Sequence, residues 1–189
     1  MYLASDNGRL DKLETYLNGV SSVPPGSEGL IFLPYLFGER APIWDADAKA
    51  VFFGIRAIHG PHHFLRSVIE GISFSLYQIG LSIEATIGPI NKIYASGGFI
   101  QSELWLQLLS DIFNKEISVT NAADASAIGA AIMGWHALGR IDDLQERPKN
   151  IDLFKTYEPD EKRHQIYMKN FSVFARLYEK LKEEFQVSF

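Results

Sequence analysis

Hydrophobic positions recur with a helical period in two long stretches of the chain. In the first, apolar residues follow one another at spacings of three and four and form one face of a predicted helix, which we expect to lie in the core: Leu65, Ile69, Ile72, Leu76, Ile79 and Ile83. The second stretch repeats the stripe, with Lys and Glu between its members: Tyr167, Phe171, Phe174, Tyr178, Leu181 and Phe185. We expect a C-terminal helix over about residues 160–187.

A coiled-coil dimer is one interpretation of this last stripe. Packing against the chain's own domain is the interpretation that we favour, because about two to three heptads are few for an independent coiled coil.

Shorter apolar runs between the two stripes predict strands. Three runs are bounded by turn formers or stand before a helical pattern: Leu30–Leu33, Lys92–Ala95 and Glu116–Val119. The helical patterns that follow the second and third runs cover residues 102–113 and about 124–138. Because strand and helix alternate, we expect an α/β fold.

Composition narrows the class of protein. The 189 residues are 47% hydrophobic, which suits one globular domain with a sizeable core. The lack of Cys and of a signal-peptide pattern at the start of the sequence favours the cytoplasm. The net charge is -5 without a basic block, so we expect no nucleic-acid partner. No apolar run reaches the roughly 18 residues of a membrane span, so we expect no membrane partner.

A pair of adjacent glycines, Gly97 and Gly98, stands between the second predicted strand and the helix that begins at about Ser102. Glycine has no Cβ, so the backbone there can lie against a flat ligand or take a positive φ, and the N–H groups at the helix start add polar contacts. A nucleotide fits such a turn. The pair matches neither G-x-x-x-x-G-K-[ST] nor G-x-G-x-x-G, and taken alone it is more often a tight turn.

Three longer segments carry a specific resemblance to a known family. "AVFFGIRAIHGPHHFLRSVIEG" (residues 50–71) has residue types that the second signature of the FGGY carbohydrate kinases permits, at the spacings of that signature: Ala50, Phe52, Gly54, Ile55, His63, Phe64, Ser67, Val68, Ile69 and Glu70. "GLIFLPYLFGERAPIWDADA" (residues 29–48) resembles a block of the xylulokinase and gluconokinase branch. "ASGGFIQSELWLQLLSDIF" (residues 95–113) is similar to the adenosine-site segment of that family, and residues 24–29 and 157–160 favour gluconokinase.

The resemblance implies a ribonuclease H-like fold, shared with actin and hexokinase. The chain resembles only the second domain of such a kinase, a single truncated domain over residues 1–189 without its opening β-hairpin strands. The implied function is ATP-dependent phosphorylation of a sugar or sugar acid, gluconate foremost, with Mg²⁺ in the complete enzyme. In such kinases the first domain holds most of the sugar site and the Asp that acts as general base. We therefore expect no catalytic residue in this chain, and no activity of the chain alone.

The resemblance assigns four residues to the adenosine side of the nucleotide site. Gly98 matches a glycine whose backbone touches the adenosine, and Ser102 matches a position where a short polar side chain approaches the adenine. Gly97 and Phe99 flank them. Phe99 stands where Ala or Gly is frequent, and it either lines the base pocket or turns away from it. The small-residue helix over residues 122–134 has a packing role or contacts the base with its N-terminal end.

Three histidines, His59, His62 and His63, resemble a metal site by their number. Adjacent His62 and His63 point in different directions and no Cys assists them, so we expect no metal there. His63 is better interpreted as a polar residue that opens a helix.

Four charged residues, Glu39, Arg40, Asp45 and Asp47, suggest paired carboxylates for acid/base chemistry. An ion pair in a surface loop, together with turn capping, is the interpretation that we favour. A cleft-facing role for the turn at residues 38–40 is the alternative.

The sequence is compatible with a fragment, the product of a broken gene, or one chain of a split enzyme. The alternative function is a non-catalytic remnant or assembly module that uses the same fold for oligomerisation. A domain without its opening strands exposes a sheet edge or an apolar patch, so we expect a homo-oligomer or a partner chain. A sugar or sugar-acid substrate would then be bound through the first domain.

Overall fold

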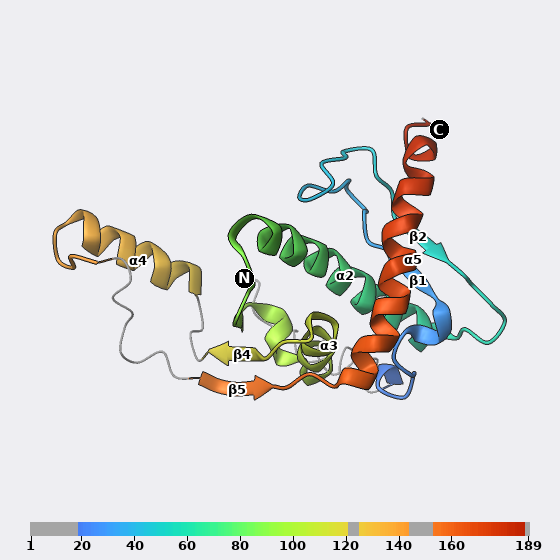
Figure 1. Ribbon diagram of the computed structural model, residues 1–189, viewed down its shortest axis with the longest axis horizontal. Coiled ribbons are helices and arrows are strands. Elements are labelled where there is room, and N and C mark those ends of the chain that lie inside the picture. Colours follow the sequence, from blue (N-terminus) through green and yellow to red (C-terminus); the bar gives the residue numbers. More distant parts are fainter. Residues whose placement is uncertain (1–18, 121–124, 144–152, 188–189) are drawn as a thin grey trace, which may run out of the picture. The chain divides into compact units, whose positions relative to one another are not determined.

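The computed structural model describes residues 19–120, 125–143 and 153–187. Its elements group into two compact units, one made of the residues up to Pro89 and from Glu161 onward, the other of Ile90–Asp160 (Figure 1). Each unit has its own sheet and combines strands with helices, which confirms the α/β class. That residues 1–189 form a single domain stays a prediction. Among the described residues, no helix is long and apolar enough to cross a membrane.

In the first unit, a short antiparallel sheet lies against the long helix α2 (Pro61–Ile87). β1 (Ile31–Leu33), which follows the 3-10 turn η1 (Ser27–Gly29), pairs with β2 (Val51–Phe53). All of β1 is buried, as its apolar run predicts. A Cβ on Gly71 of α2 would lie 2.2 Å from the carbonyl oxygen of Phe32, so the close approach of helix and strand requires glycine.

The buried face of α2 differs from the apolar stripe that the sequence predicts for the core. Ile69 is buried, but Leu76 and Ile83 are 40% and 41% exposed. The buried residues of this helix are mostly small or polar: Arg66, Ser67, Ile69, Glu70, Gly71, Ser73, Phe74 and Gly80. The expectation that the whole stripe lies in the core was wrong. Close packing against β1 selects small residues on the inner face, and the buried charges there have partners.

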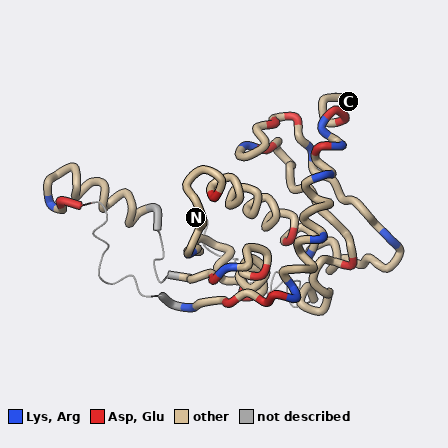
Figure 2. Tube along the Cα trace, in the orientation of Figure 1, with Lys and Arg blue, Asp and Glu red and all other residues tan. Residues whose placement is uncertain are grey.

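The helix α5 (Glu161–Phe185) packs on its own unit through aromatic side chains. Tyr167 and Phe174 are fully buried, and the ring centroid of Phe171 lies 5.8 Å from that of Phe74 on α2. Charged side chains of both signs occupy other positions of the helix (Figure 2). These contacts confirm that the C-terminal stripe is a packing face of the domain rather than a coiled-coil seam.

Lys49 holds the C-terminal end of α5. Its Nζ donates to the carbonyl oxygen of Phe185 and, at 3.3 Å, to that of Val187. A positive charge is favourable at the C-terminus of a helix, where carbonyl groups lack partners within the helix. Lys49 therefore joins the loop between β1 and β2 to the last described residues.

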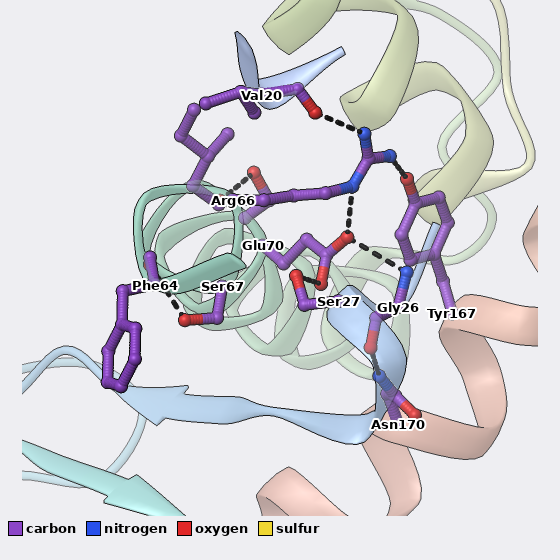
Figure 3. Close-up of polar contacts among 11 residues, drawn as sticks. Val20, Gly26, Ser27, Phe64, Arg66, Ser67, Glu70, Tyr167 and Asn170 are labelled. Carbon is purple, nitrogen blue, oxygen red and sulfur yellow. Dashed lines mark hydrogen bonds and ion pairs between the residues drawn. The ribbon is translucent and has the colours of Figure 1, made fainter. Parts of the chain in front are cut away.

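A buried ion pair lies at the centre of the first unit (Figure 3). The Nε of Arg66 donates to Oε1 of Glu70 at 2.9 Å, and the two side chains are 5% and 2% exposed. The Glu70 carboxylate also accepts from the backbone N–H of Gly26 at 2.9 Å and from the hydroxyl of Ser27 at 2.8 Å. Burial raises the pKa of Glu70, and the Arg66 guanidinium and these donors act in the opposite direction.

The remaining donors of Arg66 extend this contact to two other segments. One donates to the carbonyl oxygen of Val20 at 3.3 Å and another to the hydroxyl of Tyr167 on α5 at 2.8 Å. The side-chain amide of Asn170, one turn further along α5, donates to the carbonyl of Gly26 at 2.7 Å. The pair therefore joins α2, α5 and the loop before β1, and nearly every polar atom in it is satisfied.

In the second unit, three strands form a mixed sheet. β3 (Ile93–Ala95) runs parallel to β4 (Ile117–Thr120), and β5 (Leu153–Tyr157) pairs with β4 in the antiparallel sense. The helix α3 (Glu103–Phe113) connects the parallel pair and packs on one face of the sheet, while α4 (Ala125–Ala137) follows β4. The core of this unit is apolar: Ala95, Leu106, Leu109, Ile117, Val119 and Tyr157. The predicted strand–helix alternation is confirmed here.

We predict that Glu70→Leu lowers the free energy of unfolding by about 3–5 kcal/mol, because it leaves the guanidinium of Arg66 buried without a counter-charge. Combining it with Arg66→Met should recover most of this loss, because both buried charges then disappear together. Urea unfolding of the parent, the two single variants and the double variant measures the coupling.

Glu179→Gln serves as the control, because Glu179 pairs with Lys182 on the exposed side of α5 and should contribute little. Losses that simply add in the double variant would show that Arg66 and Glu70 are not coupled.

Candidate functional site

The turn that connects β3 to α3 contains both candidate glycines, and their backbones differ. Gly97 has φ 100 and ψ -176, a conformation that is essentially restricted to glycine. Gly98 opens a short 3-10 helix, η2 (Gly98–Gln101), and has no positive φ. A Cβ built on Gly98 meets nothing within 4 Å. The fold therefore explains why residue 97 is glycine, whereas neither backbone conformation nor packing explains it at residue 98.

Ser102 caps the helix that follows. Its backbone is extended, and its Oγ accepts a hydrogen bond from the N–H of Trp105 at 3.3 Å. A serine hydroxyl that accepts one bond can still donate its own hydrogen. Ser102 is half-buried, so the same side chain can fix the helix start and meet a ligand at the turn.

The side chain of Phe99 packs against the core of the second unit, to which it belongs. Its ring centroid lies 5.7 Å from that of Trp105, and the half-buried ring contacts the apolar core. The sequence leaves two roles open for Phe99, lining the base pocket or turning away from it. These contacts favour the second role, in which the ring packs on the protein core. The assignment of Phe99 to a base pocket stays a prediction.

An ion pair between Glu103 and Lys155 lies beside the turn that contains Gly97 and Gly98. Glu103 stands in the first turn of α3, where the helix dipole would otherwise favour an anion, and its carboxylate is paired with Lys155 of β5. The helix start therefore already holds a negative side chain.

The small-residue helix expected over residues 122–134 corresponds to α4. Residues 121–124 lie outside the described residues, and with them the N-terminal end to which a base contact was assigned. In the described part of this helix, Gly129, Ala130 and Ala131 are exposed, so the close packing expected of small residues is not seen at these positions.

The acidic residues of the loop before β2 act as structural acceptors. Glu39 and Asp45 exchange two backbone hydrogen bonds of 2.8 and 2.9 Å, and Oδ1 of Asp45 accepts from the N–H of Asp47 at 2.9 Å. Oδ2 of Asp45 accepts from the hydroxyl of Tyr178 at 3.0 Å. Burial and this carboxylate raise the pKa of Tyr178 to about 12, so the phenol remains a donor at neutral pH. Turn capping by the carboxylates of Glu39 and Asp45 is confirmed. The ion pair expected beside it is not seen, since Arg40 has no ion pair among the described residues.

The histidines have local partners. Nδ1 of His63 accepts from the N–H of Gly60 at 3.2 Å, which confirms that His63 opens α2. Nδ1 of His59 accepts from the N–H of Arg56 at 3.0 Å. In the part of the chain that the structure describes, no group of three or more His, Cys, Asp or Glu side chains is arranged to hold a metal ion.

Known proteins with similar sequences identify the family. The model of the FGGY family of carbohydrate kinases, C-terminal domain, matches residues 4–138. The chain is 36% identical over 177 residues to the gluconokinase of Bacillus subtilis, which covers 93% of this chain and 34% of that protein. It is 34% identical over 174 residues to a xylulose kinase of Staphylococcus epidermidis, with 92% and 35% covered.

The fold is that of a solved relative. The crystal structure of gluconate kinase from Lactobacillus acidophilus matches with a TM-score of 0.81 and 36% identity, over 89% of this chain and 34% of that one. This likeness confirms the ribonuclease H-like, actin/hexokinase-like fold predicted from the sequence. The chain spans about a third of the length of the curated relatives that it matches.

We predict that Gly97→Ala and Gly98→Ala have different effects on stability. Gly97→Ala should lower the free energy of unfolding by about 1–3 kcal/mol, because alanine is strained at its backbone angles. Gly98→Ala should be neutral or stabilise by up to about 1 kcal/mol, because its Cβ meets open space and restricts the unfolded chain. Chemical denaturation of both variants measures the difference, and equal losses would contradict the distinction.

Proposed function

The chain belongs to the FGGY family of carbohydrate kinases, and from this premise we propose that it forms the nucleotide-side, C-terminal part of an ATP-dependent sugar or sugar-acid kinase. The acceptor that we propose is gluconate, supported by the similarity to gluconokinases in sequence and structure. The complete enzyme would use ATP with Mg²⁺ and act in the cytoplasm.

The observation that carries this proposal is the open glycine at residue 98. No positive φ and no neighbouring atom requires glycine there. A flat ligand lying against the backbone would require it, since a side chain would stand between the two. We assign the adenosine to this surface, with the Ser102 hydroxyl as a donor to the base and Gly97 fixing the turn.

The paired Glu103 and Lys155 beside the turn support an arrangement in which the phosphates lie elsewhere. Phosphoryl transfer depends on positioning and on stabilising charge around the γ-phosphate, and it also needs a base for the attacking hydroxyl. We propose that the remaining two thirds of such a kinase supply the sugar site, the general base and the phosphate contacts, in the same chain or in a partner chain.

A second candidate function is an assembly module without catalysis. It is favoured by three exposed apolar residues that share one face of the C-terminal half of α2, at spacings of seven and four: Leu76, Ile83 and Ile87. A row of this kind on one helix is suited to contact with another chain. We propose a homo-oligomer or a partner chain for this second function.

We predict that the purified 189-residue chain shows no ATP-dependent phosphorylation of gluconate, xylulose or glycerol above background. Activity should appear when the chain is fused behind the N-terminal two thirds of a gluconokinase relative. A coupled assay of ADP release measures both. Turnover that co-purifies with the chain alone would contradict the first expectation, and an inactive but folded fusion would favour the assembly module.

The same fusion tests the nucleotide surface. Gly98→Val should weaken ADP binding by at least about tenfold, roughly 1.4 kcal/mol, with little change in melting temperature. Ser102→Ala should weaken binding by about 0.5–1.5 kcal/mol, the value of one neutral hydrogen bond. Because Ser102→Ala also removes a helix cap, Ser102→Asn is the matched control, since asparagine retains the capping acceptor.

Isothermal titration calorimetry gives the affinities, and thermal unfolding gives the stabilities. If Gly98→Val sharply lowers the melting temperature and leaves the ADP affinity unchanged, the glycine pair forms a tight turn and does not bind the nucleotide.

A further inference from the structure

Trp44, in the loop between β1 and β2, combines exposure with backbone strain. Its side chain is 76% exposed and its φ is 56, a left-handed conformation that is unfavourable for a bulky residue. The backbone bonds between Glu39 and Asp45 close the loop around it, and its own N–H donates to the carbonyl oxygen of Arg40 at 2.5 Å. The fold thus holds a large aromatic ring out in solvent in a conformation that tryptophan does not favour. Strain of this kind concentrates at functional positions.

A cavity of about 490 Å³ opens beside this ring. One wall is the loop at residues 43–47. The other is formed by three residues of the last turns of α5 and by Gln186, which follows the helix: Tyr178, Lys182, Glu183 and Gln186. The hydrogen bond from Tyr178 to Asp45 joins the two walls. The cavity is open to solvent on one side, and it shares no residue with the turn at Gly97.

The polar groups of the cavity are suited to hydroxyl groups. The carboxylate of Asp47 accepts hydrogen bonds, and the amide of Gln186 both donates and accepts. Neither side chain has a hydrogen-bond partner among the described residues. An aromatic face carries a negative quadrupole, which attracts the C–H edge of a ligand ring lying on it.

The charges of the cavity disfavour an anion. Asp45, Asp47 and Glu183 are acidic, whereas Lys182 is the basic residue of the lining and is already paired with Glu179 at 2.8 Å. A nucleotide, a sugar phosphate or a sugar acid would add negative charge to this surface. We propose that the cavity binds a neutral sugar or polyol, which packs on the Trp44 ring and bonds to Asp47 and Gln186 through its hydroxyl groups.

An exposed tryptophan is also suited to a protein interface. Leu36 and Phe37 of the same loop are 70% and 98% exposed, so contact with a second copy of the chain is the competing explanation. The polar lining beneath the ring favours the sugar, since an interface core is depleted of charged residues.

The test uses the whole chain, titrated with D-xylose, D-glucose and xylitol and followed by tryptophan fluorescence and saturation-transfer NMR. A saturable change is expected with at least one of the three. Gluconate should bind at least about tenfold more weakly than that ligand because of its charge. Gln186→Ala should weaken binding about fivefold, the loss of one neutral hydrogen bond.

Two variants at Trp44 separate binding from folding. Trp44→Asn should abolish binding while the melting temperature stays the same or rises, because asparagine tolerates a positive φ better than tryptophan. Trp44→Phe should retain weakened binding through its smaller ring. Trp135→Phe, in the other unit, is the matched control and should leave the fluorescence response to sugar intact.

Three outcomes would overturn the proposal. The first is the absence of saturable binding by all three neutral ligands. The second is equal binding by Trp44→Asn and the parent chain. The third is a fluorescence change that follows protein concentration and light scattering instead of ligand, which would assign Trp44 to contact between copies.

Discussion

The first unit depends on the buried pair of Arg66 and Glu70. Two charges out of water are costly unless their remaining hydrogen-bonding atoms have partners. Here those partners come from segments far apart in sequence, since Gly26 lies 44 residues before Glu70 and Tyr167 lies 101 residues after Arg66. The cost of burial is therefore offset only when α2, α5 and the loop before β1 are correctly placed. We infer that the pair favours this packing of the unit over alternative ones.

The candidate nucleotide site follows a different principle, because its geometry depends on backbone instead of charged side chains. Gly97 provides the bend, and Gly98 leaves a flat, open surface beside it. Ser102 then fixes the first turn of α3. Such a surface binds a ligand by its shape and through a few hydrogen bonds. It is suited to a part of the ligand that takes no part in the reaction. Charge stabilisation and proton transfer belong to other parts of a kinase.

Periodicity predicted the elements whose patterns are long or sharply bounded, namely α2, α3, α4, α5, β1, β3 and β4. β2 and β5 escaped prediction: β2 is three residues long with a mostly exposed face, and β5 carries Lys155 in its centre. Pairing with a neighbour, which a single sequence does not reveal, makes these segments strands. The position of the glycine pair was equally predictable. The sequence did not predict that Gly97 and Gly98 are glycine for different reasons, nor that the backbone of Trp44 is strained. Both depend on φ angles, which tertiary contacts determine.

The first unit is built from both ends of the chain, with the second unit inserted between them. When the chain is synthesised from its N-terminus, α2 therefore leaves the ribosome well before α5, whose Tyr167 and Phe174 complete its packing. During that interval Phe74 lacks its aromatic partners and Arg66 lacks the hydroxyl of Tyr167. The inserted unit has its own sheet and its own core. The packing of the first unit is therefore completed only by residues that are synthesised after the whole second unit.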